Sequence, residues 1–560
     1  MKQLKLAMVA ACLSGVMGTH ANAALYTITE LPTQGIALNS FATSINNAAD
    51  VSAVFTGVYN PPIDLELIDL DDDLFVDNLT DIDAARNGNF NAEDLTFISA
   101  VIAGQIGNLR QRIANNQSYV INADASNSDD IRFVAGFDAI DPDLGVFSRS
   151  TATQVRAINN QGVVVGSSED KFDKLAYTTE DGTDQTYVLQ DFGLRALVTI
   201  DGVNYGIAPE IDTISAFTEA YDVNDSLLVA GYESIDPTET RLNAVENCAD
   251  EEIRGDVPVE SCYQTLLTSG ISTSFQLRGA LWQLNQQGEV VSREILGLLL
   301  TPEEDDSRLF VSRAVAVNEN GIAVGDSSDY YQDDTNQVRT FAAVFDNGEV
   351  SDITDHEDYF NSTATDINDS NIVVGQANLN VSGFTRTKFF YHDYNNGTVI
   401  YPDDFFQGSS SVARSINNNN MIVGSGEIDS TINAERRTAA FIYDINEDSF
   451  QDLNDMVACD SPYSLVRADS INDNNQIVAT AVARRQTFDI LGEPRLDDNG
   501  EPVLQDLVVS VLLDPIANGQ IDDCEPPPNE VQERSGGSFG WGVLSLMGLG
   551  LIRRRLTQSR

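Results

Sequence analysis

Histidine is the side chain best suited to acid–base catalysis near neutral pH, and the sequence has three: His20, His356 and His392. His356 lies in the acidic stretch 352–358, and His392 lies in an aromatic segment, Phe389–Asp393. Neither has the GxSxG or HExxH surroundings of a serine or zinc hydrolase. The histidines therefore predict no catalytic residue, and we expect structural or solvated roles for His356 and His392.

Carboxylates are the most abundant chemical groups, because 86 Asp+Glu stand against 32 Lys+Arg and give a formal net charge of −54. Two carboxylates that face a cleft could hydrolyse a glycosidic bond, but this abundance singles out no pair. The charge repels nucleic acid and anionic membrane surfaces. We therefore expect no nucleic-acid partner.

Calcium prefers oxygen ligands, and two acidic stretches could supply them. One is Asp69–Asp73, and the other contains Asn122, Asp124, Asp129 and Asp130. Neither follows the D-x-[DN]-x-[DN]-G pattern of a calcium loop. The sequence therefore predicts no cofactor, identifies no metal-ligating residue and leaves calcium as an open alternative.

The first 23 residues have the basic start, the apolar run and the small-residue cleavage site of a secretory signal peptide. Signal peptidase would cut between Ala23 and Ala24. A lipobox is the alternative, since Val9-Ala-Ala-Cys12 would make Cys12 a lipidated N-terminus. Because the apolar segment before Cys12 is very short, we favour cleavage after Ala23.

Four cysteines remain after such a cut: Cys248, Cys262, Cys459 and Cys524. An even number in an exported chain predicts two disulfides, which we expect between Cys248 and Cys262 and between Cys459 and Cys524. A zinc site is the alternative, but the chain has no CxxC pair and few histidines.

One pattern recurs seven times: a small residue, a β-branched residue, an asparagine, a polar turn and a second β-branched run. The repeated asparagines are Asn46, Asn159, Asn224, Asn318, Asn368, Asn417 and Asn472. Each copy predicts a β-hairpin in which the asparagine serves turn geometry rather than a binding face. A second hairpin with an aromatic strand follows most copies. The last four asparagines are 50, 49 and 55 residues apart, which is the period of a propeller blade.

The two ends of the repeat region complement each other. The last strand, Leu507–Leu513, lacks a following partner, and the mature N-terminus opens with a strand-like segment, Tyr26–Leu31. Their pairing would close a ring. We therefore predict an all-β fold, a β-propeller over residues 24–516, with seven blades favoured and eight if segment 119–138 contains a further degenerate unit.

Two insertions interrupt the early repeats, at residues 60–118 and 236–277. The first contains a predicted helix near residues 91–115, capped by Asn91. Its apolar stripe is Leu95, Ile98, Ile102, Ile106, Leu109 and Ile113.

Four arginines recur near the aromatic strands: Arg278, Arg339, Arg386 and Arg437. In a ring they would occupy equivalent positions. We favour ion pairs between these arginines and the Asp-rich turns. The alternative is a cationic ring near one propeller mouth that holds an anionic ligand such as an acidic glycan.

The units resemble HAF repeats of exported bacterial proteins over roughly residues 25–515, although the histidine of the namesake motif is absent. The strands begin instead with Arg278-Gly-Ala, Thr340-Phe, Lys388-Phe and Thr438-Ala. The whole chain also resembles a family of exported Gram-negative proteins known as a domain of unknown function. The resemblance implies a fold and a compartment, and no activity.

After a proline-rich acidic linker, 517–534, residues 535–560 resemble the GlyGly sorting tails cut by rhomboid-type intramembrane proteases. Gly536 and Gly537 precede the apolar run Val543–Ile552 and the basic stop Arg553–Arg555. The run is short for a stable transmembrane helix, which fits transient anchoring in the inner membrane. The resemblance implies cleavage and release to the cell surface or the medium, and a permanent anchor is the alternative.

These observations predict an exported, surface-displayed or secreted binding or scaffold propeller, with a glycan or an envelope protein as its partner. They offer no positive evidence for catalysis. The alternatives are an enzyme that acts on extracellular polysaccharide through acidic residues at the propeller mouth, and a structural component of the envelope or matrix.

Overall fold

A computed structural model of the chain describes residues 24–32, 35–104, 107–123, 131–142, 145–303, 305–431 and 435–521. The chain divides into two compact units, of which the first ends at Asp522 and the second is 523–560. The predicted signal peptide, Cys12, Cys524, Gly536 and Gly537 lie outside the described residues. Among the residues that are described, no helix is long and apolar enough to cross a membrane.

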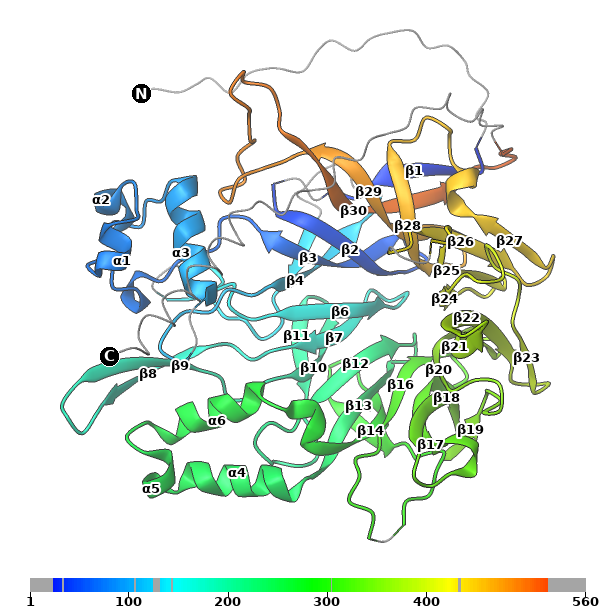
Figure 1. Cartoon of the computed structure of the whole chain (residues 1–560), viewed down its shortest axis with the longest axis horizontal. Coiled ribbons are helices and arrows are strands. Elements are labelled where there is room, and N and C mark those ends of the chain that lie inside the picture. Colours follow the sequence, from blue (N-terminus) through cyan, green and yellow to red (C-terminus); the bar gives the residue numbers. More distant parts are fainter. Residues whose placement is uncertain are drawn as a thin grey trace. The chain divides into compact units, whose positions relative to one another are not determined.

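Seven four-stranded sheets form the blades of a β-propeller (Figure 1). Blade 1 consists of β2 (Ala37–Ile45), β3 (Asp50–Val58), β4 (Asn116–Asn122) and β5 (Ile131–Val134). Blade 2 consists of β6 (Thr153–Ile158), β7 (Val164–Ser168), β10 (Arg195–Ile200) and β11 (Val203–Ile207). Blade 3 consists of β12 (Thr218–Val223), β13 (Leu228–Pro237), β14 (Phe275–Leu284) and β15 (Val290–Ile295).

Blades 4 to 7 follow in the same order. Blade 4 consists of β16 (Ser312–Val317), β17 (Ala323–Tyr330), β18 (Val338–Asp346) and β19 (Glu349–Asp352), and blade 5 consists of β20 (Asn361–Ile367), β21 (Ile372–Val381), β22 (Phe384–Asp393) and β23 (Thr398–Ile400). Blade 6 consists of β24 (Ser411–Ile416), β25 (Met421–Glu427), β26 (Thr438–Asp444) and β27 (Ser449–Asp452). Blade 7 consists of β28 (Tyr463–Ile471), β29 (Ile477–Gln486), β30 (Leu504–Pro515) and β1 (Tyr26–Glu30). The first strand of each blade contacts the first strand of the next, and β28 contacts β2.

The seven-blade prediction is confirmed, and the alternative of eight blades is wrong. Segment 119–138 holds no further unit, because it supplies the two outer strands of blade 1, β4 and β5. The predicted closure is also confirmed. Strand β1 pairs antiparallel with β30, from Tyr26 opposite Pro515 to Glu30 opposite Val511, so both ends of the repeat region build blade 7 (Figure 1).

The core consists of apolar layers between neighbouring blades. The second strand of each blade is largely buried on both faces, which explains continuous β-branched runs such as Val163-Val-Val. The largest buried side chains are aromatic, and Trp282, Phe341, Phe389 and Phe441 are among them. These rings come from the third strand of their blades, which is the strand that the sequence marks by its aromatic residues.

The first insertion folds on its own small apolar core. It comprises η1 (Leu65–Leu67), α1 (Asp73–Val76), α2 (Ile82–Ala85) and α3 (Ala92–Gly104). Asn91 caps α3 as expected, since its side chain accepts the Asp94 N–H at 2.8 Å. The predicted helix near residues 91–115 is too long, because α3 ends at Gly104 and Gly107 follows with φ +119. Leu109 and Ile113 of the predicted stripe therefore lie beyond the helix.

The second insertion joins β13 to β14 and is helical: α4 (Glu239–Ala249), α5 (Glu251–Arg254), α6 (Val259–Thr268) and η3 (Ile271–Thr273). The predicted disulfide between Cys248 and Cys262 is confirmed and ties α4 to α6. The pair Cys459–Cys524 stays a prediction. The sequence patterns did not reveal a third insertion, the hairpin of β8 (Asp173–Thr178) and β9 (Asp184–Leu189). Two short turns complete the fold, η4 (Tyr331–Asp333) and η5 (Leu453–Met456).

Candidate functional site: the central channel

The seven repeated asparagines form a closed ring of hydrogen bonds at one mouth of the channel. Each Nδ2 donates to the backbone carbonyl of the corresponding asparagine in the next blade at 2.9–3.1 Å, and Asn472 donates back to Asn46. Each Oδ1 accepts backbone N–H groups of its own turn, as Asn417 does from Asn419 and Met421. The side-chain amides of these asparagines therefore already make hydrogen bonds within the protein.

A second ring runs beside the first. The backbone N–H of the residue after each asparagine donates to the side chain of the equivalent residue in the next blade, at 2.5–3.0 Å. The members are Asn47, Asn160, Asp225, Glu319, Asp369, Asn418 and Asp473. The two rings surround a hollow of about 280 Å³. This mouth therefore joins the blades through side chains whose hydrogen bonds are already made.

Every blade has a β-bulge at one common position, three residues before its ring asparagine. A bulge turns one side chain out of the alternation of the strand. The seven bulged residues are Thr43, Arg156, Tyr221, Val315, Thr365, Arg414 and Asp469. All seven line a single cavity of about 690 Å³. Each repeat thus places one side chain in the channel, and the type of that side chain varies from blade to blade.

Glycines on the second strand make room for this bulge. A Cβ at Gly424 would lie 2.0 Å from the carbonyl oxygen of Val412, and one at Gly325 would lie 2.0 Å from that of Arg313. Gly166, Gly231 and Gly375 meet the first strand in the same way. This close approach explains the glycine that ends the second β-branched run of each of these five repeats. Blades 1 and 7 have Ala53 and Ala479 there instead.

Two of the arginines that line the cavity have partners. Arg156 pairs with Glu219 at 3.2 Å and lies 4.1 Å above the ring of Tyr221. Arg467 contacts Asp469 at 2.5 Å and donates to the Thr480 hydroxyl at 3.1 Å. These contacts hold both guanidiniums against the wall of the channel.

Arg414 differs from them. Among the described residues its guanidinium has no hydrogen-bond or ion-pair partner, although the side chain is exposed to the cavity. Desolvation by the surrounding channel wall and the charge of Arg467 lower the pKa of Arg414, and the charge of Asp469 partly opposes them. The charged residues that line the cavity are Arg156, Arg414, Arg467 and Asp469, three cations against one anion. The channel therefore has an excess of positive charge inside a strongly acidic protein.

Two carboxylates lie one residue beyond the bulge, Asp222 and Asp366. Burial raises the pKa of Asp222 to about 6, and burial together with the charge of Asp222 raises the pKa of Asp366 to about 7. Each accepts a backbone N–H from the following blade at 2.9 Å, Asp222 from Val317 and Asp366 from Ile416. Both carboxylates thus connect adjacent blades.

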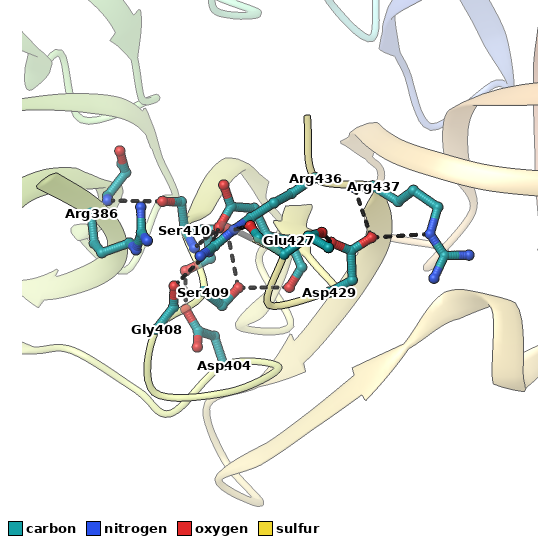
Figure 2. Close-up of polar contacts among 12 residues, drawn as sticks. Arg386, Asp404, Gly408, Ser409, Ser410, Glu427, Asp429, Arg436 and Arg437 are labelled. Carbon is teal, nitrogen blue, oxygen red and sulfur yellow. Dashed lines mark hydrogen bonds and ion pairs between the residues drawn. The ribbon is translucent and has the colours of Figure 1, made fainter. Parts of the chain in front are cut away.

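The four arginines near the aromatic strands have mixed surroundings. Arg437 pairs with Asp429 at 3.1 Å (Figure 2), which agrees with the favoured ion-pair interpretation. Arg278 and Arg339 donate instead to the backbone carbonyls of Phe310 and Phe360. Arg386 donates to its neighbour Thr385 and lies over Phe384. For these three the predicted pairs with Asp-rich turns are absent from the described contacts, and none of the four lines the channel cavity.

The histidines also lie outside the channel lining. His392 is buried in β22, and burial lowers its pKa. His356 stacks on Phe341 with ring centroids 3.6 Å apart.

Of the two stretches considered for calcium, the described part of the first serves the local fold. Asp72 caps α1 through the Leu74 N–H at 2.8 Å, and Asp71 pairs with Arg86 at 2.6 Å. In the second stretch Asn122 donates to Asp50 at 2.8 Å, while Asp124, Asp129 and Asp130 lie outside the described residues.

The channel arginines were missed by the sequence patterns, although a signal for them exists. The position three before each repeat asparagine is occupied by Thr, Arg, Tyr, Val, Thr, Arg and Asp in turn. The residue before it is Ala or Val in every copy, and the residue after it is Ala, Ser or Asp. The variability of this position inside a regular repeat is the signal that could have singled out these channel-lining residues.

A larger hollow of about 1120 Å³ lies between the first insertion and blade 1, and Tyr59, Phe90, Phe147 and Arg149 line it. Arg149 already donates to the Tyr119 hydroxyl at 2.9 Å and stacks on Phe133 at 3.8 Å. The guanidinium of Arg149 in this hollow is thus already engaged. The channel cavity is smaller but has an unpaired charge, so it is the stronger candidate for a binding site.

Solved structures with a similar fold have little sequence in common with this chain. The β-propeller domain of the Trilobed protease from Pyrococcus furiosus is 9% identical, with 84% of this chain and 95% of that chain covered and a TM-score of 0.33. Pyrococcus horikoshii acylaminoacyl peptidase is 11% identical, with 82% and 53% covered and a TM-score of 0.35. An oligogalacturonate lyase in complex with manganese is 9% identical, with 73% and 89% covered and a TM-score of 0.33.

No curated protein matches the sequence. One protein family matches residues 3–555, nearly the whole chain. This seven-bladed propeller belongs to the family described as protein of unknown function DUF3466.

Proposed function

We propose that this protein is an exported, non-catalytic binding propeller that holds an anionic ligand in its central channel. The observation that carries the proposal is the guanidinium of Arg414, which faces the channel cavity without a partner among the described residues. A guanidinium that has no ion-pair partner and lies near a second cation, Arg467, is unfavourable for a folded protein. A ligand of opposite charge would offset that cost, which gives a reason for the arginine at this position.

The chemistry of the cavity indicates the class of ligand. Arginine binds carboxylate and sulfate groups in a bidentate manner. Tyr221 offers an aromatic ring, and Gln376 contributes an amide whose buried Oε1 has no partner among the described residues. A cavity of about 690 Å³ has the size of a small-ligand site. An acidic oligosaccharide, such as a short oligouronate, combines the negative charge, the ring faces and the hydroxyl groups that these side chains would bind.

The test compares binding of trigalacturonate with binding of neutral maltotriose, by calorimetry in 150 mM salt, to the wild-type protein and to Arg414→Gln. We expect the wild type to bind only the acidic sugar and Arg414→Gln to bind it at least about 10-fold more weakly, because a charge-assisted contact is lost. Arg484 is exposed on β29 outside the cavity, so Arg484→Gln is the matched control for the change in net charge.

Thermal unfolding separates this proposal from a structural role of Arg414. Since the guanidinium makes no described ion pair and lies near Arg467, its removal should leave the unfolding midpoint unchanged or raise it. A loss of stability together with unchanged binding would mean that Arg414 serves the fold. Equal weakening in Arg484→Gln would mean that only the overall charge matters.

An enzyme that cleaves extracellular polysaccharide is the second candidate, and the raised pKa values of Asp222 and Asp366 favour it. Both carboxylates, however, accept a backbone N–H from the following blade. That engagement supports a role in joining blades, so we place binding before catalysis. Release of reducing ends from polygalacturonate by the wild type, abolished in Asp222→Asn, would reverse this order.

Export is the remaining part of the proposal, and it rests on the signal-like residues 1–23 and the sorting-like tail 535–560. Signal peptidase and a rhomboid-type protease would be the processing partners. The intact mass of the native protein should correspond to a chain that starts at Ala24 and ends near Ser535, found at the cell surface or in the medium. A full-length C-terminus in the inner membrane would instead indicate a permanent anchor.

A further inference from the structure

Three side chains that can bind a metal ion meet on the outer part of blade 4. Asp329 lies near the end of β17, Asp352 ends β19, and His356 follows in the next loop. The Nε2 atom of His356 lies 2.9 Å from Oδ2 of Asp352 and 4.0 Å from Oδ2 of Asp329. One ligand atom of each residue lies within 4.8 Å of the other two. The three residues therefore converge on a single point.

The backbone and a neighbouring ring orient all three groups. Asp352 accepts the Thr354 N–H through Oδ1 at 3.0 Å, which leaves Oδ2 for His356. Asp329 accepts the Tyr330 N–H through Oδ1 at 2.7 Å and presents Oδ2 in the same way. The imidazole of His356 stacks on Phe341 at 3.6 Å with an interplanar angle of 19°. Supporting contacts of this kind hold the ligands of a metal site in their orientation.

A buried polar atom at the centre of this cluster makes no hydrogen bond. The Nε2 atom of His356 is buried and has no hydrogen-bond partner among the described residues, because Asp352 lies close to it without the alignment of a hydrogen bond. Among the described residues no lysine or arginine pairs with Asp329 or Asp352. In a tetrahedral zinc site, bonds of about 2.0–2.1 Å place neighbouring ligand atoms about 3.3 Å apart. The distances from Nε2 of His356 to Oδ2 of Asp352 and to Oδ2 of Asp329, 2.9 and 4.0 Å, lie on either side of that value.

We propose that Asp329, Asp352 and His356 form a binding site for a divalent transition-metal ion of the Zn²⁺ type, with water in the open position. One imidazole nitrogen and two carboxylate oxygens suit Zn²⁺ and its neighbours, whereas calcium and magnesium favour oxygen ligands alone. The ion would join the end of β17 to the end of β19 and to the loop that follows. This site is independent of the channel and of the ligand proposed for it.

The test is a zinc titration of the full chain, purified without a histidine tag and dialysed against a chelator. Zinc chloride competes with a chromophoric chelator in the presence of excess Mg²⁺, which occupies the many surface carboxylates. We expect one saturable zinc ion per chain. His356→Gln should weaken it at least about 100-fold and Asp329→Asn at least about 10-fold, since loss of a ligand exceeds the about 10- to 100-fold effect of losing an outer-shell contact.

The control is Asp358→Asn, which removes an exposed carboxylate from the same loop and should leave zinc affinity unchanged. Zinc should also raise the thermal unfolding midpoint of the wild type and of Asp358→Asn but not of His356→Gln. Unchanged circular dichroism of Asp329→Asn would show that its loss of affinity is not a loss of fold. Absence of saturable binding, or equal affinity in His356→Gln, would overturn the proposal and leave an ion pair between His356 and Asp352.

Discussion

Asp366 shows how a single half-buried carboxylate can join two blades and still oppose folding. Its side chain accepts the Ile416 N–H, yet burial and the charge of Asp222 raise its pKa from 3.8 to about 7. Between those two values the folded chain holds a proton that the unfolded chain has released. The contribution of Asp366 to the free energy of unfolding therefore falls as pH rises from about 4 to about 7, and its loss is complete above pH 7.

The variant Asp366→Asn removes this titration and retains an oxygen that can accept the Ile416 N–H. We expect its stability relative to the wild type to increase from pH 5 to pH 8, by on the order of 1–3 kcal/mol. Urea unfolding at both pH values measures the difference. Asp498→Asn, in an exposed turn, is the control and should show no such change. A parallel pH dependence of Asp366→Asn and wild type would show that Asp366 is ionised in the folded state throughout this range.

At the scale of the element, the first hairpin of each blade combines a bulge, a ring asparagine and a small residue opposite the bulge. In blade 6 these are Arg414, Asn417 and Gly424. The glycine has no positive φ, so its role is space: a Cβ there would meet the carbonyl oxygen of Val412 at 2.0 Å. In blade 6 the bulge that carries Arg414 into the channel lies beside this close approach.

Gly424→Ala should therefore push β24 away from β25 and destabilise the protein by about 1–3 kcal/mol, the usual effect of overpacking. The alanines at this position in blades 1 and 7 indicate that a shifted strand can still form a bulge. Gly104→Ala, where a Cβ meets nothing within 4 Å, is the control and should be neutral. Denaturant unfolding of both variants checks the prediction, which fails if the two are equally stable.

At the scale of the whole molecule, the propeller is closed by two devices. The asparagine rings link all seven blades at one mouth, and β1 completes blade 7 from the opposite end of the chain. Glu30 of β1 is further held by Arg485 at 2.7 Å. Without β1, strand β30 would be the outer edge strand of blade 7, so the pairing with β1 protects this long hydrophobic strand from pairing with another molecule.

Ile28 is the central apolar contact of β1, since it packs against the core between blades 6 and 7. We expect Ile28→Asp to lower the free energy of unfolding by about 2–4 kcal/mol and to promote aggregation through the exposed edge of β30. Thr29 is its exposed neighbour and lies opposite Leu512, so Thr29→Asp should change stability by less than about 0.5 kcal/mol. Thermal unfolding and light scattering of the two variants give the answer, and equal behaviour would mean that β1 contributes little to closure.

The sequence by itself determined the blades and their closure and favoured seven blades over eight, because each rests on local or repeated signals. The spacing of the asparagines, the alternation of β-branched runs with Asn, Asp and Gly turns, and the complementary end strands Tyr26–Leu31 and Leu507–Leu513 suffice for the ring. It also determined the Cys248–Cys262 bridge, whose partners share one insertion. The end of helix α3 at Gly104 was missed, since an apolar stripe continues past the point where the backbone turns away.

Only the tertiary structure decided which side chains meet in the channel. The recurring arginines of the aromatic strands look equivalent in sequence, yet they lie outside the cavity, whereas Arg156, Arg414 and Arg467 share it. Hairpin signals are local, but a bulge that redirects one residue per blade brings together positions as distant as Arg156 and Arg467. Asp329, Asp352 and His356 are likewise separate in the sequence, and the fold of blade 4 brings them together. A repeat specifies its own unit, and the closed ring sets which residues of different units become neighbours.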